Sequence, residues 1–177
     1  MKYYAGTHDG PFRQYVQMLD HNLNIMGNDM GMEVDNEGED QKYSDLCSIN
    51  NNFFLAYSNL VGISYGVFIQ KYNSEGQELW ASPINLVEGG FGGDNLVRAI
   101  IPNSTNGGVI VIYDSASVIH GYFLNIIFVS VDGEILSQSS ICDDCNNPQY
   151  ESHAVGDNEF VVTYKTASSS LSTGVFS

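Results

Sequence analysis

Apolar residues of this chain gather in short runs, and clusters of Gly, Asn, Asp and Ser separate one run from the next. No window keeps apolar residues at positions i, i+3, i+4 and i+7, the spacing of an amphipathic helix. The runs are rich in β-branched and aromatic residues, which favour strands. The pattern therefore predicts an all-β fold with many tight turns.

One kind of apolar run, which ends in Tyr, occurs three times. The copies cover residues 53–57, 109–113 and 160–164. Their last residues, Tyr57, Tyr113 and Tyr164, mark a period of about 50–57 residues, which is the length of one four-stranded propeller blade. A turn signal precedes each run, at residues 50–52, 106–108 and 156–158.

A second turn signal follows the propeller-length period. It is Gly76 in one copy and Gly133 in the next, each about twenty residues after the Tyr. In the first copy His21 and Asn22 stand at this place, and we expect Asn22 to adopt the positive φ that Gly would provide. An apolar residue follows three positions later: Ile25, Leu79 and Leu136.

The Tyr-ending runs are apolar at nearly every position, whereas a strand with one face in water would alternate. A strand is buried on both faces when sheets stack on one another. We therefore predict consecutive four-stranded antiparallel blades, β-propeller-like or a stacked repeat array, in an incomplete ring. A plain β-sandwich is the alternative. The residues expected in the repeat core are Phe54, Tyr57, Val111, Tyr113, Val161 and Tyr164.

The period divides the chain into four parts: 1–58 (partial at its N-terminus), 59–114, 115–165, and 166–177 as the start of a fourth repeat. In the second period we expect strands at 52–58, 66–72, 77–86 and 94–101. Three periods are too few to close a propeller. We expect a segment of a longer protein, or a protomer that completes its sheet with a neighbour's strands and builds a head-to-tail filament.

Charge and composition exclude several classes of protein. The chain has 177 residues with 6 Lys+Arg and 21 Asp+Glu, a net charge of −15, so it repels nucleic acid and anionic lipid. With 43% hydrophobic and 15% charged residues, it is not a disordered acidic tail. The apolar runs are too short for membrane insertion.

The segment from Phe53 to Trp80 resembles repeats of about fifty residues in large secreted and surface proteins of bacteria and ciliates. Those repeats run G-x-F-V-V-x-W-x-S, then G-x-x-x-Q-x-Y-x-x-x-G-x-x-x-G. The matching residues here are Phe54, Tyr57, Ser58, Gly66, Gln70, Tyr72 and Gly76, then Tyr113, Gly121 and Gly133, then Phe160, Val161, Val162, Tyr164 and Gly174. The chain departs from the family by having Tyr for Trp and by lacking the last Gly.

This resemblance implies a propeller-like or extended array outside the cell or on its surface, with an adhesive or structural role and no catalytic signature. We expect a non-enzymatic protein that associates with itself or with neighbouring segments of a larger protein. The alternative is a carbohydrate- or ligand-binding propeller domain, in which Tyr65, Phe91 or Tyr122 would serve as exposed platforms.

The cysteines form one close pair. Cys142 and Cys145 make a C-x-x-C, whereas Cys47 stands alone. A zinc site needs a second pair of Cys or His ligands, and a thioredoxin-like site needs a βαβ unit. We expect a local disulfide between Cys142 and Cys145; free thiols are the alternative. Cys47 would be free or intermolecular.

Two surface sites are further hypotheses. The densest acidic run contains Asp35, Glu37, Glu39 and Asp40, and it is either a solvated loop or a calcium site, the one cofactor that we consider. Asn103 begins an Asn-Ser-Thr sequon, which predicts a glycan if the chain enters a secretory pathway.

One short motif matches an enzyme signature. Residues 62–66 read G-x-S-x-G around Ser64. A nucleophile elbow places this Ser on a turn between a strand and a helix, whereas no helix is expected here. We therefore predict no catalytic residue.

Overall fold

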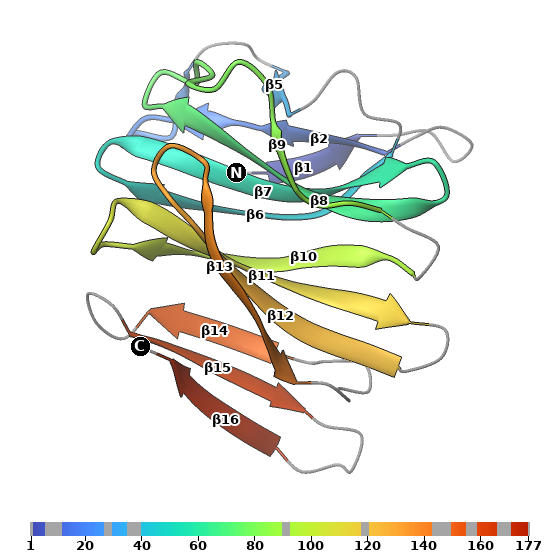
Figure 1. The fold of residues 1–177 in the computed structure, drawn as a ribbon. Helices are drawn as coiled ribbons and strands as arrows, with labels where there is room; N and C mark the ends of the chain where they lie inside the picture. The colour runs from blue at the N-terminus through green and yellow to red at the C-terminus, as the bar shows by residue number, and fades with distance from the viewer. Residues whose placement is uncertain are drawn as a thin grey trace.

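The computed structural model describes residues 2–5, 12–26, 30–34, 40–89, 93–117, 121–142, 150–154, 159–165 and 171–176. These residues form strands and turns and include no helix (Figure 1). The prediction of an all-β fold is therefore confirmed. No helix among them could cross a membrane.

Two four-stranded antiparallel sheets form the middle of the molecule, and each is a simple meander. The first four-stranded sheet contains β6 (Gln41–Ile49), β7 (Asn52–Val61), β8 (Ser64–Asn73) and β9 (Ile84–Val87). The second four-stranded sheet contains β10 (Asn95–Asn103), β11 (Gly108–Ser117), β12 (Gly121–Val129) and β13 (Ile135–Cys142).

Smaller sheets lie at the two ends of the chain. The N-terminal sheet has the order β1 (Lys2–Ala5), β2 (Arg13–Val16), β5 (Met32–Glu33). Between β2 and β5 in the chain, β3 (Met18–Leu19) and β4 (Ile25–Met26) form a separate hairpin. The C-terminal sheet contains β14 (Tyr150–Ala154), β15 (Phe160–Lys165) and β16 (Leu171–Phe176).

The strands expected in the second period occur, with two differences. The expected strand 77–86 is strand only from Ile84, since Pro83 has no N–H to donate to a ladder. The expected strand 94–101 is β10, but it pairs with β11 and opens the next sheet. The expected period boundaries after residues 58 and 114 consequently fall inside β7 and β11.

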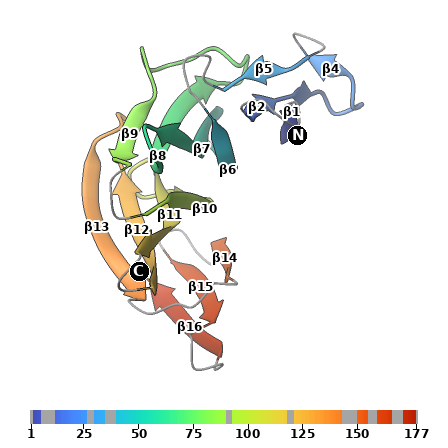
Figure 2. The same ribbon diagram turned by 90° about the vertical axis from the view of Figure 1, so that its right-hand side faces the viewer.

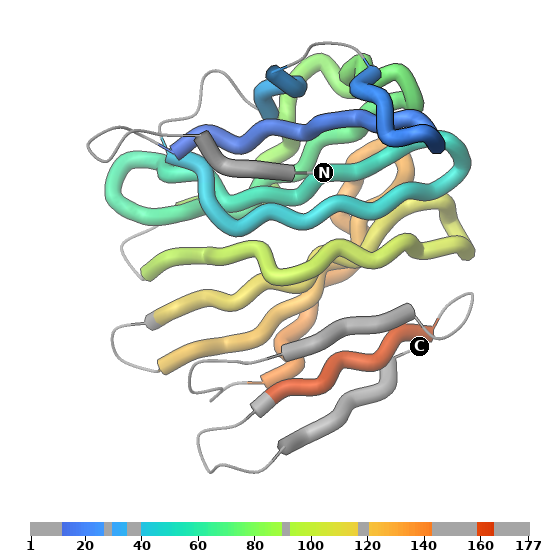
Figure 3. The backbone as a smooth tube through the Cα atoms, turned by 180° about the vertical axis from the view of Figure 1, so that it is seen from behind, coloured from blue at the N-terminus to red at the C-terminus, as the bar shows by residue number. Residues whose placement is uncertain are grey.

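The sheets stack face to face in chain order, as Figures 1 and 2 show. A hydrophobic cluster fills each of the three interfaces between neighbouring sheets. In Figure 2 the first strands β6 and β10 lie on one side of the stack, and the last strands β9 and β13 lie on the other. Seen from behind in Figure 3, β10 runs alongside β6, although the two belong to different sheets. The described sheets do not close a ring.

Strand β7 is buried on both faces. Leu55 and Tyr57 point to the N-terminal sheet, and Phe54 and Ala56 point to the second four-stranded sheet; all four are 0% exposed. This follows from the sequence, because the run is apolar at every position and a pleated strand turns alternate residues to opposite faces. A two-sheet sandwich buries one face of each strand, so that alternative is wrong for this chain.

Strand β11 repeats this division. Val111 and Tyr113 point to the first four-stranded sheet, whereas Ile110 and Ile112 point to the C-terminal sheet. In the C-terminal sheet, Tyr164 packs against the cluster shared with the second four-stranded sheet. Each of the three Tyr side chains therefore faces the sheet that precedes its own in the chain.

One five-residue turn occurs three times with the same hydrogen bonds. It starts at Asp20, Asn73 or Ser130, whose side-chain oxygen accepts the N–H groups two and four residues later. The N–H of the first residue also donates to the carbonyl of the residue four positions later, and its carbonyl accepts the N–H of the residue three positions later. The residue three positions after the first has positive φ: Leu23 at 66°, Gly76 at 82° and Gly133 at 92°.

The expectation that Asn22 would adopt positive φ is therefore wrong by one residue, since Leu23 does so. The Asp20 carboxylate explains the shift, because it accepts both the Asn22 and the Asn24 N–H and so fixes where the turn begins. Counting from Leu23, the residue equivalent to Leu79 and Leu136 is Met26 rather than Ile25.

Candidate functional site

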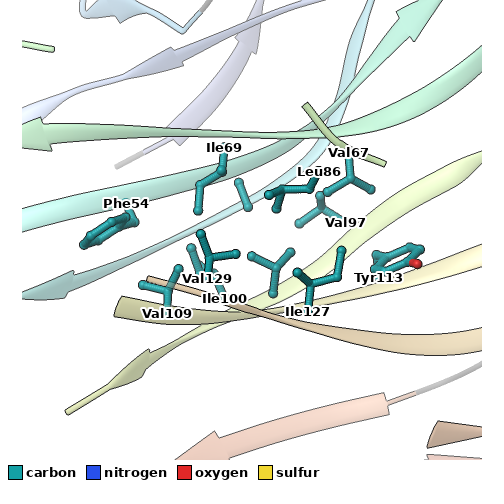
Figure 4. Close-up of a cluster of buried hydrophobic side chains, with 12 residues drawn as sticks. Phe54, Val67, Ile69, Leu86, Val97, Ile100, Val109, Tyr113, Ile127 and Val129 are labelled. Atoms are coloured by element: carbon teal, nitrogen blue, oxygen red, sulfur yellow. The ribbon is translucent and has the colours of Figure 1, made fainter. Parts of the chain in front are cut away.

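The largest interface joins the two four-stranded sheets and is a continuous apolar layer. Phe54 lies at one end of this layer and Tyr113 at the other (Figure 4). Its members come from β7, β8 and β9 on one side and from β10, β11 and β12 on the other: Phe54, Ala56, Val67, Ile69, Leu86, Val97, Ile100, Val109, Val111, Tyr113, Ile127 and Val129. At about 25 cal/mol per Å² of buried apolar surface, a layer of this kind dominates the stability of the stack.

Side chains of the first four-stranded sheet bind the free backbone edge of β10. The N–H of Val97 donates to Ser58 Oγ at 2.8 Å, and the N–H of Ile100 donates to Asp45 Oδ2 at 3.1 Å. An edge strand left open would be a template for pairing with other chains. The neighbouring sheet thus satisfies this edge and fixes the position of one sheet on the next.

Two β-bulges, one in β6 and one in β10, meet across the same interface. The register of β6 shifts at Tyr43, which has φ 46°, and the register of β10 shifts at Arg98. A bulge re-aims its side chain, and the Arg98 guanidinium lies over the Tyr43 ring at 5.2 Å. This cation–π contact adds a polar tie beside the apolar layer.

Arg98 also pairs with a buried carboxylate. Its Nε donates to Asp114 Oδ2 at 2.7 Å, and its Nη2 bonds the same oxygen. Burial raises the pKa of Asp114 above its usual value, and the Arg98 guanidinium opposes this by favouring the charged form. Arg98 therefore favours the charged form of Asp114 inside the stack.

A second polar cluster lies where three sheets meet. Asp40 accepts the Phe12 N–H at 2.8 Å and the Tyr65 hydroxyl, and it pairs with the Lys42 ammonium at 3.3 Å. Lys42 also lies over the Tyr65 ring at 4.8 Å. We call Phe12, Asp40, Lys42 and Tyr65 the rim cluster. The N–H of Tyr65 donates to Asp94 Oδ1 at 3.2 Å, which joins the cluster to the second four-stranded sheet.

The rim cluster holds its members in their ordinary charge states. Burial raises the pKa of Asp40, but hydrogen bonds from Tyr65, Phe12 and Lys42 outweigh burial and lower it overall. The pKa of Lys42 is raised, chiefly by its interaction with Tyr65 and then by Asp40. Burial and the Asp40 hydrogen bond raise the pKa of Tyr65. The cluster therefore suits a permanent tie between sheets.

An open cavity of about 310 Å³ adjoins the turn between β6 and β7. Asn50 and Asn51 form this two-residue turn with φ of 50° and 61°, as a type I′ hairpin requires. Amides, hydroxyls and one aromatic ring line the cavity: Ser48, Ile49, Asn50, Asn51, Asn52, Phe53 and Ser74. Its volume is at the lower end of the range for ligand pockets.

The predicted core residues are placed as follows. Phe54, Tyr57, Val111 and Tyr113 lie in buried clusters. Tyr164 packs against the cluster shared with the second four-stranded sheet, and half-buried Val161 alternates with it on β15.

The predicted calcium site falls mostly outside the described residues. Asp35, Glu37 and Glu39 are not described, and Asp40 belongs to the rim cluster, where Lys42 neutralises it. In the part of the chain that is described, no group of three or more His, Cys, Asp or Glu side chains could hold a metal ion. The calcium hypothesis stays a prediction.

Cys142 is disulfide-bonded and Cys47 is a free thiol. Cys145 lies outside the described residues, so its pairing with Cys142 stays a prediction. Burial, helped by Asp45, raises the pKa of Cys47 to about 12. Cys47 therefore remains protonated at neutral pH and is a poor nucleophile.

Asn103 ends β10 and precedes the exposed turn that leads to β11. Its side-chain oxygen accepts the Thr105 N–H at 3.2 Å. This position is at the surface, as a glycosylated Asn requires, and glycosylation stays a prediction. Ser64 opens β8 and is 4% exposed, which differs from the exposed serine of a nucleophile elbow.

The three suggested aromatic platforms differ in exposure. Tyr65 is only 7% exposed, because its ring packs under Lys42, so it is not a surface platform. Tyr122 is 37% exposed on β12, and Phe91 lies outside the described residues.

Sequence reasoning missed Tyr43, Asp45, Arg98 and Asp114. Nothing in one sequence marks a β-bulge, because a bulge depends on the register between two strands. The one available signal was charge: Arg98 and Asp114 interrupt otherwise apolar segments, and such residues are rarely buried unless they are paired.

In comparisons with known proteins, no family model matches the chain and no curated protein matches it.

Proposed function

We propose that the chain is a non-enzymatic structural or adhesive repeat protein outside the cell or on its surface. In this proposal the stacked sheets are successive blades of a propeller-like array. The protein associates with further copies, or with neighbouring segments of a larger protein, by adding sheets to the stack.

The observation that supports this proposal is the five-residue turn that occurs three times. The turns at Asp20, Asn73 and Ser130 share their side-chain and backbone hydrogen bonds. Each of the last two also packs on strands that precede its own sheet in the chain. A Cβ on Gly76 would lie 3.1 Å from Met18 Sδ, and one on Gly133 would lie 2.1 Å from Ile84 Cδ1. Units that repeat both internally and in their contacts are typical of arrays built by adding units.

The same division of faces indicates how the array would continue. On β7 and β11, the residues that alternate with the Tyr positions contact the following sheet. The equivalent residue on β15 is Val161, which is half-buried. In our proposal a further sheet covers this face of β15.

The test is the state of association in solution. We expect light scattering to report a mass that increases with concentration, and electron microscopy to show elongated particles. Val161→Glu should abolish the increase, since it places a carboxylate where the next sheet would dock. Ile63→Glu, at a position 74% exposed on the tip of a hairpin, is the matched control and should change nothing. A mass that stays monomeric at every concentration would contradict self-association.

A second candidate, carbohydrate or ligand binding, is favoured by the cavity at the β6–β7 turn. Planar amides beside an aromatic ring suit the alternating polar and apolar faces of a sugar. Asn51→Gly removes one amide but keeps the positive φ, so the turn should survive. If this function is correct, soluble oligosaccharides shift the NMR signals of residues 48–53 in the wild type, and the variant binds them more weakly. No shift with any sugar would contradict it.

A further inference from the structure

Three buried side chains near the interface of the N-terminal sheet and the first four-stranded sheet carry unpaired polar atoms. These are Gln14 Nε2 and Oε1, Asn59 Oδ1 and Ser64 Oγ, which have no hydrogen-bond partner in the described part of the chain. The three residues are 2%, 6% and 4% exposed. A buried donor or acceptor without a partner loses the hydrogen bonds that water provides in the unfolded chain.

The Gln14 side chain points toward the first four-stranded sheet. Along β2, Gln14 and Val16 are buried while their neighbours are half-buried, and Val16 belongs to the cluster shared with that sheet. The Gln14 N–H donates to Gln41 Oε1 at 2.9 Å across the interface. Gln14 therefore lies directly beside Gln41 of β6.

The register of the first four-stranded sheet places Asn59 beside Gln41. Gln41 is opposite Asn59, and Asn59 is opposite Gly66, so the three occupy one row on one face. Ser64 is two residues from Gly66 on β8 and points to the same face. The unpaired atoms of Gln14 and Asn59 thus lie beside one polar row that the N-terminal sheet covers at Gln14, whereas Ser64 is opposite Val61 in the next row.

The chemistry of the row determines what would fill it. Gln14 has an unpaired donor and an unpaired acceptor, and Asn59 has an unpaired acceptor. A metal cation could bind the oxygens but could not accept a hydrogen bond from Gln14 Nε2. A small molecule that both donates and accepts hydrogen bonds can satisfy both ends of this amide. We propose that ordered water occupies this row and bridges Gln14 to Asn59.

Bound water also explains how a polar row persists between two packed sheets. A buried water commonly makes two to four hydrogen bonds to groups that would otherwise be unsatisfied. The N-terminal sheet is therefore held partly through solvent, unlike the apolar interface between the four-stranded sheets. This inference does not depend on the proposed function.

Direct detection uses the full wild-type chain. We expect a nuclear Overhauser cross-peak between the Gln14 side-chain amide protons and water, with the sign that indicates bound rather than bulk water. A high-resolution crystal structure should show water density within hydrogen-bond distance of Gln14 Oε1 and Asn59 Oδ1. A cation identified by anomalous scattering after a rubidium soak, or a protein side chain in this density, would overturn the proposal. An empty row would also overturn it.

A substitution gives an independent test through the direction of its effect. Gln14→Met keeps the side-chain length and removes both unpaired atoms. If water bridges the row, the variant loses those bonds and the midpoint of thermal unfolding should fall by about 3 °C or more. If the row is dry, the variant relieves an unpaired amide and the midpoint rises. Gln70→Met is the control: Gln70 is fully buried with both side-chain ends bonded, so its midpoint should fall in either case.

Discussion

The two faces of the first four-stranded sheet are built differently. The interface with the second four-stranded sheet contains a cluster of twelve buried residues, from Phe54 to Val129. The interface with the N-terminal sheet contains a buried cluster of five and, beside it, the polar groups of Gln14, Gln41 and Asn59. The free energy gained from apolar contact is roughly proportional to the buried area and does not depend on direction. A buried polar group, in contrast, needs a matched hydrogen-bond partner.

One stacked architecture can therefore contain a strong and a weak interface. We expect the N-terminal sheet to open at a lower free energy than the pair of four-stranded sheets, since local stability follows buried apolar contact. Four predictions test this comparison, ordered by the size of the change in stability that each expects.

Phe54→Ala should have the largest effect. Phe54 is 0% exposed between the four-stranded sheets, and its loss should lower the free energy of unfolding by about 3–5 kcal/mol. Val16→Ala, in the N-terminal interface, should cost about 1.5 kcal/mol, from the two methyl groups that it removes. Chemical denaturation followed by circular dichroism measures both values. Equal costs would break the comparison, and Phe54→Leu supplies a milder variant.

Arg98→Ala should cost about 3 kcal/mol near neutral pH, because it leaves the Asp114 carboxylate buried without its cation. The loss should depend on pH. Without Arg98, the raised pKa of Asp114 rises further, so the native state holds a proton more tightly than the unfolded state does. Stability then falls as pH rises above the unfolded value of 3.8.

The control for the Arg98–Asp114 ion pair is Asp114→Asn. In the double variant Arg98→Ala/Asp114→Asn, the pH dependence seen with Arg98→Ala alone should disappear. Denaturation midpoints at several pH values from acid to neutral measure the effect. A loss that is the same at every pH would contradict the role of Arg98 as the partner of a buried charge.

Leu23→Gly should stabilise the protein by about 1 kcal/mol. Leu23 has φ 66°, which costs an L-residue about 1–2 kcal/mol and costs Gly almost nothing. Gly76→Ala changes the equivalent residue of the first four-stranded sheet in the opposite direction, so it should destabilise by a similar amount. Thermal unfolding compares the pair. Destabilisation by both would show that the turns are not equivalent.

Asp40→Asn should have the smallest effect, about 1 kcal/mol or less, because the rim cluster is partly exposed and solvent screens it. The folded pKa of Asp40 is lowered, so its contribution is present above 3.8 and is lost as pH falls through the folded value. Hydrogen exchange of the N-terminal sheet measures the change. Glu75→Gln, at an exposed turn, is the control, and unchanged exchange in Asp40→Asn would contradict a tie at the rim.

The sequence was sufficient to predict the central strands, because an unbroken apolar run has a direct consequence: both faces must be covered. The runs at 53–57 and 109–113 are accordingly buried on both faces. The turn at Gly76 was also predictable, since Gly marks positive φ. In the first copy of the turn, the positive φ occurs at Leu23, one residue after Asn22, where we expected it.

The polar ties could not be predicted, because they depend on where one sheet lies on the next. Arg98 reaches Tyr43 only through two bulges, and Asp45 reaches the Ile100 N–H only because β10 runs beside β6. These contacts join residues about 55 positions apart in the chain. Neither spacing nor composition carries such information.

Tyr57, Tyr113 and Tyr164 each face the preceding sheet, and NMR distances from their rings to methyl groups test this placement. We predict contacts from Tyr57 to Val16 or Val34, from Tyr113 to Val67, and from Tyr164 to the methyl groups of Ile110 or Ile112. Contacts from the Tyr113 ring to Val162, on the following sheet, would contradict it.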